Sequence, residues 1–279
     1  MKIFYMSYEF INGNQIALIP KEFSFNADEN YYRKLKSVLT IKRAKDLPFV
    51  RVGKANDGGY IMVDKFNTGG GQATAYSFGI SDDISWDADM AKRGYDVFMY
   101  DMTIDKLPYE NEKFHFFKEG IGGVKDETKL LDTLENFIAR NGHENNSNMI
   151  LKMDVEGAEW NFLETVSSET LNKFDQMTFE FHGMIAPKTA DEMARTINLI
   201  DKINATHTLV HVHGNNSGYY IQVDNVGNIP SLLELTYLRN ENHTFYDDEA
   251  ILLPIAFDNP NHPALVDIPL GYWNKFKRV

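Results

Sequence analysis

The sequence predicts an α/β protein built on a Rossmann-like, doubly wound and mostly parallel sheet, and three observations support this. From Thr74 onward, short apolar strands alternate with helical segments, which is the pattern of βαβ units. Several of these strands end at an acidic residue or a glycine, as strands do where a parallel sheet meets its ligand. The turn-forming run 224–227 separates two late apolar segments and predicts an antiparallel addition.

Composition limits the class of protein. A chain of 279 residues suits one large α/β domain with additions. The net charge of −12 argues against nucleic-acid binding, and the absence of cysteine excludes disulfides, thiolate metal sites and cysteine nucleophiles. We find no apolar run long enough to span a membrane and no signal-peptide pattern, so we expect a soluble, cytoplasmic protein. The oligomeric state stays open, a homo-oligomer included.

Residues 1–72 are predicted to form an N-terminal extension packed on the core. Within them we expect an aromatic-rich arm, then a helix over 30–44, because apolar residues recur there at helical spacing. Residues 49–64 predict two strands around the turn Asp57-Gly58-Gly59. The glycine run in 67–72 is the predicted boundary, so that residues 73–279 form the Rossmann-like domain with C-terminal wrapping loops.

Strands are expected at 75–78, 97–100, 114–117, 149–153 and 177–181, with further strands at 208–213, 219–223 and 232–238. A helix over 84–93 is expected to begin at Ser81, Asp82 or Asp83 and to stop at Gly94. Three further helices are predicted. The first carries Leu130 and Leu131 on its apolar face and ends at Asn141-Gly142, the second begins at Ala158, and the third covers 190–203. For the last, Thr189 and Glu192 predict a capping box.

Three strand ends together indicate a nucleoside pocket. The first strand ends in a small-residue turn at Gly79 and Ser81, where backbone N–H groups can meet an anion. The second ends at Asp101, roughly 20 residues later, where an acid holds a ribose diol in dinucleotide-type folds. The third ends before Gly120, where a glycine lets a ring lie against the backbone. The turn departs from G-x-G-x-x-G, which disfavours a nicotinamide cofactor.

The next strand ends suggest a metal. Asp154 follows the buried strand 149–153, although an aspartate there also serves as a helix N-cap. Glu180 and His182 lie on one face of the following strand, and His211 and His213 repeat that spacing, although strand histidines are often structural. Because neighbouring parallel strands end at one edge, Asp154, Glu180 and His182 could converge on Mn²⁺ or Fe²⁺, and zinc accepts a similar set.

These residues carry a resemblance to a known family. The segments Ala75-Tyr76-Ser77-Phe78-Gly79-Ile80, Tyr100-Asp101 and Leu151 to Trp160, with Asp-Val-Glu-Gly-Ala-Glu at its centre, resemble FkbM-type methyltransferases that use S-adenosylmethionine. The resemblance covers about residues 51–238. It implies a class I methyltransferase acting on hydroxyl oxygens, often of sugars. More narrowly, the chain is similar to O-methyltransferases that modify nucleotide-linked heptoses for bacterial capsular polysaccharide.

The favoured hypothesis is therefore a metal-assisted sugar O-methyltransferase with a small-molecule, nucleotide-linked sugar substrate. Asp154, Glu180 and His182 are the expected ligands of Mn²⁺, Fe²⁺ or Mg²⁺, and Asp154, His182, His211 and His213 the expected catalytic residues. We expect the turn at Asp57 and Tyr60 to lie over the amino-acid end of the cofactor. The predicted cofactor-binding residues are Asp57, Tyr60, Phe78, Gly79, Ser81, Asp101, Met102, Gly120 and Ile121. The alternatives are a metal-dependent hydrolase, which would leave Asp101 idle, and a non-catalytic nucleoside-binding or interaction module.

Overall fold

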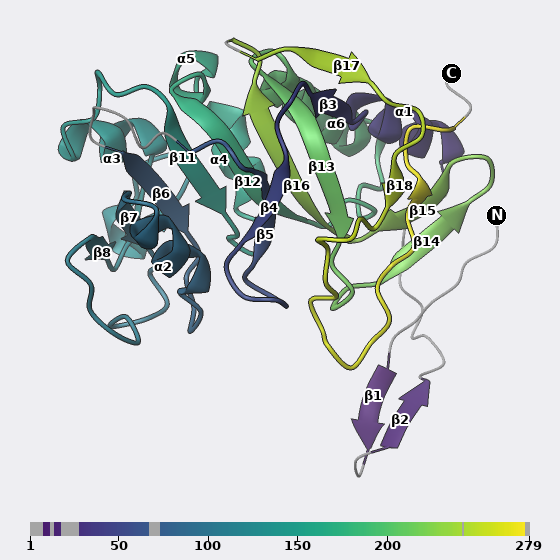
Figure 1. Cartoon of the computed structure of the whole chain (residues 1–279), viewed down its shortest axis with the longest axis horizontal. Helices are drawn as coiled ribbons and strands as arrows, with labels where there is room; N and C mark the ends of the chain where they lie inside the picture. The colour runs from purple at the N-terminus through teal and green to yellow at the C-terminus, as the bar shows by residue number, and fades with distance from the viewer. Residues whose placement is uncertain (1–7, 12–13, 18–27, 67–72, 242, 277–279) are drawn as a thin grey trace.

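A seven-stranded sheet forms the centre of the computed structural model, which describes residues 8–11, 14–17, 28–66, 73–241 and 243–276 (Figure 1). The strand order is β13-β16-β12-β11-β6-β7-β8, and β16 is antiparallel to both of its neighbours. The other pairs are parallel. The strands are β6 (Thr74–Phe78), β7 (Asp96–Tyr100), β8 (Phe114–Phe117), β11 (Met149–Met153), β12 (Phe174–His182), β13 (His207–Gly214) and β16 (Leu232–Arg239). This arrangement confirms the predicted Rossmann-like sheet with a late antiparallel strand.

Both faces of the sheet are covered because successive strand side chains point to opposite sides. On one face, Tyr76 and Phe78 of β6 belong to a large core that also contains buried residues of several helices. Those helices are α1 (Glu29–Val38), α3 (Leu134–Arg140), α4 (Glu159–Thr165), α5 (Ser168–Leu171) and α6 (Ala190–Asn204). On the other face, Ala75 joins a second core with Trp86 and Met90 of α2 (Ser85–Lys92). The sheet is therefore doubly wound, as predicted.

Helix boundaries follow local chemistry. Thr189 and Glu192 form the predicted capping box at the start of α6, and Gly94 follows α2 with φ of 95°. The N-cap of α2 is Ile84, which has no capping side chain, although Asp83 accepts a hydrogen bond from the Ser85 N–H at 2.9 Å. The helix predicted to carry Leu130 and Leu131 is shorter than expected. A 3₁₀ turn, η1 (Glu127–Lys129), and the short strand β10 (Leu131–Asp132), paired with β9 (Gly120–Ile121), precede α3.

Helix α1 and the predicted hairpin at 49–64 contribute buried side chains to the two cores, with one correction to the predicted helix. The helix predicted over 30–44 ends at Val38, and β3 (Lys42–Ala44) pairs instead with β17 (Phe245–Asp247). The β-branched residues that follow the helix favour this extended pairing. The predicted hairpin is confirmed as β4 (Phe49–Val52) and β5 (Tyr60–Val63). The boundary predicted at 67–72 lies outside the described residues, as does most of the N-terminal arm apart from β1 (Tyr8–Ile11) and β2 (Asn14–Ala17).

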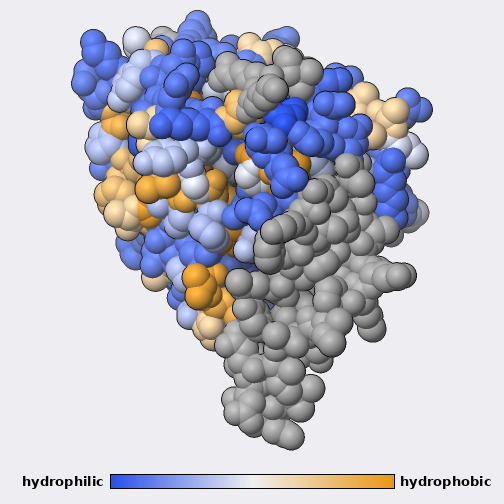
Figure 2. All heavy atoms as spheres, turned by 90° about the vertical axis from the view of Figure 1, so that its right-hand side faces the viewer, coloured by the Kyte–Doolittle hydropathy of each residue, from blue (hydrophilic) through white to orange (hydrophobic). Residues whose placement is uncertain are grey.

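The C-terminal part adds short hairpins and loops. The turn at 224–227 joins β14 (Tyr220–Val223) to β15 (Gly227–Pro230), so the strand predicted at 219–223 lies in this hairpin and not in the central sheet. The last pair is β18 (Leu252–Leu253) with β19 (Gly271–Tyr272). Figure 2 views the molecule from the right-hand side of Figure 1. Where this face is not grey, it is largely hydrophilic, with hydrophobic residues in scattered groups. No helix within the described ranges is long and apolar enough to cross a membrane.

Candidate functional site

A cavity of about 790 Å³ opens at the carboxyl ends of β6, β7 and β11. The strand order reverses between β6 and β11, and open α/β sheets bind their ligands at such a switch point. Residues from four predicted features line it, namely the 57–58 turn, the turn after β6, the end of β7 and the glycine-rich segment 120–123. Asp154 and Glu156, which follow β11, complete one wall.

The turn after β6 is shaped by close backbone contacts. Gly79 has a φ of +78°, and a Cβ atom there would lie 1.5 Å from the carbonyl oxygen of Asp154. This position therefore requires glycine. Asp101 holds the two residues that follow Gly79, because its Oδ2 accepts the N–H groups of Ile80 and Ser81, both at 2.8 Å. These contacts fix the cavity wall where the first strand ends.

Asp101 has a structural role that its sequence position did not reveal. Its Oδ1 accepts the backbone N–H and the hydroxyl of Thr103 at 2.7 and 2.5 Å. Burial opposes ionisation, but the hydrogen bonds from Ser81, Thr103 and Ile80 outweigh it and lower the pKa of Asp101. The carboxylate is therefore ionised and already accepts four hydrogen bonds, and it shapes the turn as well as facing the cavity.

The structure brings most of the predicted cofactor-binding residues to this cavity. Those that line it are Asp57, Gly79, Ser81, Asp101, Met102, Gly120 and Ile121. Phe78 and Tyr60 do not line it. Phe78 is fully buried and stacks on Tyr100, because alternation turns it into the core, and Tyr60 lies buried beside Asp154. The expectation that these two side chains face the cofactor is corrected accordingly.

One end of the cavity forms a narrow slot. A Cβ atom on Gly120 would lie 3.0 Å from both Leu131 Cδ2 and Met102 Sδ, so these two side chains pack closely against the glycine. Ile121 and Gly122 continue the same wall. A slot with apolar side chains and exposed backbone suits a flat ring better than a bulky group.

Asp154 on the cavity wall comes together with Glu180 and His182, which do not themselves line the cavity. One ligand atom of each lies within 4.8 Å of the others, so the three side chains could hold a metal ion. The register explains this, because Met153 of β11 pairs with Phe179 of β12. Burial raises the pKa of Asp154, and burial together with Asp154 and Glu234 raises that of Glu180 well above its usual value. Two oxygen ligands and an imidazole suit Mn²⁺, Fe²⁺ or Zn²⁺, and the carboxylates alone suit Mg²⁺.

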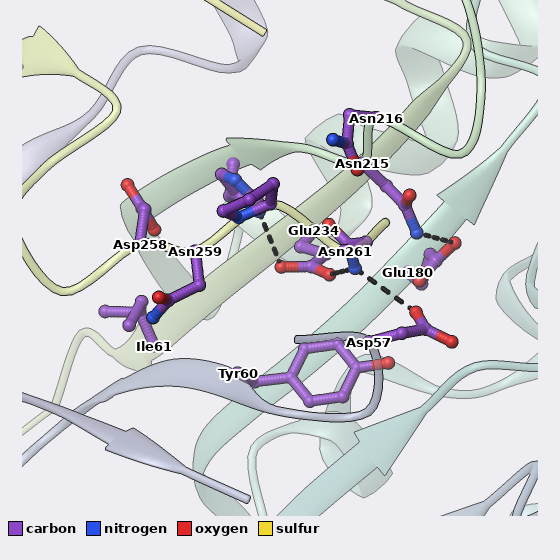
Figure 3. Close-up of polar contacts among 12 residues, drawn as sticks. Asp57, Tyr60, Ile61, Glu180, Asn215, Asn216, Glu234, Asp258, Asn259 and Asn261 are labelled. Atoms are coloured by element: carbon purple, nitrogen blue, oxygen red, sulfur yellow. Dashed lines mark hydrogen bonds and ion pairs between the residues drawn. The ribbon is translucent and has the colours of Figure 1, made fainter. Parts of the chain in front are cut away.

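Neighbouring side chains hold this three-residue cluster in place, and Figure 3 shows one of these contacts, that of Asn215 with Glu180. The Tyr60 hydroxyl donates to Asp154 Oδ2 at 2.9 Å, and the Asn215 amide donates to Glu180 Oε1 at 3.0 Å. Lys152, which is almost fully buried, donates to the carbonyl of Gly79 at 2.6 Å and thereby places a positive charge under the cavity. Each carboxylate of the cluster thus has at least one oriented partner.

His211 and His213 lie in a different environment from the one predicted. His211 Nε2 is 2.8 Å from Asp258 Oδ1, and neither histidine lines the cavity or joins the cluster. His213 lies between Glu234 and Asp267, with ring nitrogens 2.9 and 3.0 Å from them. Burial disfavours the charge, but these two carboxylates prevail and raise the pKa of His213 to about 10. An imidazole that is charged at neutral pH is a poor general base, so His213 instead anchors the C-terminal loop through Asp267, and His211 contacts the same loop at Asp258.

Sequence reasoning missed several residues of the site, and some carried a signal. Lys152 interrupts an otherwise apolar buried strand, and Glu234 does the same in β16. Glu234 pairs across the sheet with Glu180. Asn261 donates both to Glu234 and to Asp57 Oδ1, the latter at 3.2 Å, and so links the C-terminal loop to the 57–58 turn (Figure 3). No periodic pattern marks Asn261.

Comparisons with known proteins agree with this geometry in part. A model of the methyltransferase FkbM domain matches residues 11–202. A comparison with curated proteins finds no significant match. Among solved structures, the chain is similar to a Streptococcus thermophilus protein described as a candidate hemolysin, with 7% identity and a TM-score of 0.36 over 90% of this chain and 77% of that one. A similarity that weak carries no argument about function.

Proposed function

The chain belongs to the methyltransferase FkbM domain family, and on that premise we propose that it transfers the methyl group of S-adenosylmethionine to a hydroxyl oxygen of a sugar. In the transfer, the bond from sulfur to the methyl carbon breaks as the carbon–oxygen bond forms, and the hydroxyl proton leaves to a base or to water. The products are S-adenosylhomocysteine and a methyl ether. A hydroxyl is a weak nucleophile at neutral pH, so the site must supply activation.

The observation that carries the proposal is the position of Asp154. This residue lines the cavity and also belongs to the cluster with Glu180 and His182, so cofactor and activating groups would meet at one side chain. A divalent cation held by the three residues would lower the pKa of the acceptor hydroxyl and orient it. Their donor atoms fit such an ion, and burial raises the pKa of both carboxylates, although Lys152 and His182 oppose the rise at Asp154.

The rest of the cavity supports a sulfonium cofactor. Its lining is rich in acidic side chains, with Asp57 near the cluster and Asp101 near the glycine slot, and few lysines offset them. Such a wall attracts a ligand with a positive sulfonium and ammonium group. We place the ring of the cofactor in the slot at Gly120 and its amino-acid end near Asp57. His182 is the proposed catalytic imidazole.

The acceptor class follows from chemistry and from the family resemblance together. A metal beside a polar sheet edge can hold a diol or a diphosphate, which fits a nucleotide-linked sugar. The narrower choice of a heptose of capsular polysaccharide rests on the resemblance of the Asp-Val-Glu-Gly-Ala-Glu motif. Either acceptor would approach from the side of the 57–58 turn, which lines the cavity beside Asp154.

Transfer of labelled methyl from S-adenosylmethionine to a panel of free and nucleotide-linked sugars tests the proposal. We expect methylation that stops in EDTA and returns with Mn²⁺, Fe²⁺ or Mg²⁺. His182→Ala should lower metal content and turnover together but leave S-adenosylhomocysteine affinity intact. His115→Ala, on the half-buried edge strand β8, is the control. Cofactor binding without transfer to any acceptor would favour a nucleoside-binding module, and metal-dependent hydrolysis without cofactor binding would favour a hydrolase.

A further inference from the structure

Glu159 is a buried acid whose position the methyl transfer does not explain. It is the first residue of α4, its side chain is fully buried, and it does not line the cavity. A carboxylate taken out of water is costly unless it is fully hydrogen-bonded. An acid in the first turn of a helix also interacts favourably with the helix dipole, which is the simpler structural explanation. The contacts of this carboxylate show more than that.

Glu159 joins the two strand ends that supply the cluster. Its Oε2 accepts the N–H of Gly157 at 2.8 Å, in the turn that follows Asp154. Its Oε1 accepts the backbone N–H of His182 at 2.6 Å and lies 3.2 Å from His182 Nδ1. The neighbouring Trp160 also holds this strand end, because its indole N–H donates to the carbonyl of His182 at 2.8 Å. The end of β12 is thus fixed against the turn after β11.

The contact with the imidazole has a chemical consequence. Both carboxylate oxygens of Glu159 already accept backbone N–H groups, so Oε1 faces the imidazole as an acceptor and His182 Nδ1 carries the hydrogen. The other nitrogen, Nε2, then faces the cluster, where it lies 3.6 Å from Glu180 Oε1 and 3.2 Å from Glu156 Oε2. A metal-binding histidine needs a free nitrogen on the metal side and a fixed partner on the other. Glu159 supplies the fixed partner at Nδ1, and Nε2 faces the cluster, where a bound cation would replace its contact with the exposed Glu156.

We propose that Glu159 is a positioning residue that holds His182 with Nδ1 protonated and Nε2 directed at a divalent cation bound to Asp154, Glu180 and His182. This inference rests on the proposed function, because it requires the metal. It adds to that function an explanation of how the imidazole of His182 is oriented toward the metal. It also explains why the second acid of the Glu-Gly-Ala-Glu run is buried while Glu156, three residues earlier, is exposed.

Mn²⁺ affinity of the whole chain, measured by titration calorimetry, tests the inference. Glu159→Gln should weaken Mn²⁺ binding by about 10- to 100-fold, the range for partners of ligating histidines. The matched control is Asp175→Asn. Asp175 lies near the opposite end of β12, is also buried and also contacts an imidazole, that of His243 at 3.2 Å. The control should bind Mn²⁺ as the wild type does, and both variants should keep their S-adenosylhomocysteine affinity.

The possible results distinguish failure of the positioning role of Glu159 from failure of the proposed metal-assisted methyl transfer. A wild-type protein that binds no Mn²⁺ overturns both the metal and the positioning role. Wild-type binding with an unchanged Glu159→Gln affinity overturns the positioning role alone, and leaves Glu159 as a helix-terminal acid. If Glu159→Gln does not fold, a crystal structure of the wild type with Mn²⁺ decides. Coordination through His182 Nε2, with Nδ1 on Glu159, supports the inference, and coordination through Nδ1 overturns it.

Discussion

Replacing Asp101 by alanine should weaken both the fold and cofactor binding. The change removes the acceptor of four hydrogen bonds. The Ile80 N–H is buried and would stay unsatisfied, at a cost of about 1–3 kcal/mol, whereas the partly buried donors of Ser81 and Thr103 can bind water and add about 1 kcal/mol. We therefore expect the free energy of unfolding to fall by about 2–4 kcal/mol.

Urea unfolding and calorimetry with S-adenosylhomocysteine measure the two effects of Asp101→Ala. Affinity should fall by about 1.5–3 kcal/mol, or roughly 10- to 150-fold, because the turn at Ser81 loses its support. Since the folded pKa of Asp101 is lowered, its stabilisation is present above the ordinary carboxyl pKa and is lost as pH falls through the folded value. Asp105→Ala, an exposed acid nearby, is the control. Unchanged stability in the Asp101 variant would refute this account of the turn.

Two further predictions concern stability. His213→Asn should destabilise the protein at pH 7 by up to about 4 kcal/mol at 1.36 kcal/mol per pKa unit. Since the folded pKa of His213 is raised to about 10, the difference should be complete below pH ~6.5 and vanish as pH rises through about 10, and a pH-independent difference in urea unfolding would contradict the ion pairs. Gly79→Ala should lower the free energy of unfolding by more than about 1 kcal/mol and abolish S-adenosylhomocysteine binding. Gly142 has a similar φ of +74°, but a Cβ atom there would have no neighbour within 4 Å, so Gly142→Ala should lower stability only through backbone strain. Equal losses of stability in the two variants would argue against the contact with Asp154.

The sheet and its ligand edge could be predicted because they depend on short-range patterns. Alternating apolar runs define the strands, and parallel pairing brings their carboxyl ends to one edge, so Asp101, Asp154 and Glu180 fell near the cavity as expected. The strand at 219–223 and its hairpin turn were predicted, but apolar alternation does not say which sheet a strand joins. The helix over 30–44 was too long because its end depends on pairing with Phe245–Asp247, far along the chain.

The supporting contacts could not be predicted, because they depend on side chains that meet across long sequence separations. His211 and His213 have the same two-residue spacing as Glu180 and His182, which is the spacing of a ligand pair. Asp267 nevertheless makes His213 a charged anchor. Asp267 lies in a loop-rich region where no periodicity predicts a position. Glu159 stood in a recognisable motif, but its contact with His182 required the relative placement of α4 and β12. Such placement is a property of the packed core.

A crystal structure with S-adenosylhomocysteine and Mn²⁺ tests the central claim most directly. For an acceptor oxygen bound to the metal to reach the methyl group at about 3–3.5 Å, the cofactor sulfur must lie about 5–7 Å from the metal. We predict that separation, with the adenosine end at Met102 and Gly120 and the metal on Asp154, Glu180 and His182. A sulfur more than about 10 Å from a metal at this cluster, too far for the oxygen to bridge, would contradict metal-assisted methyl transfer at this site.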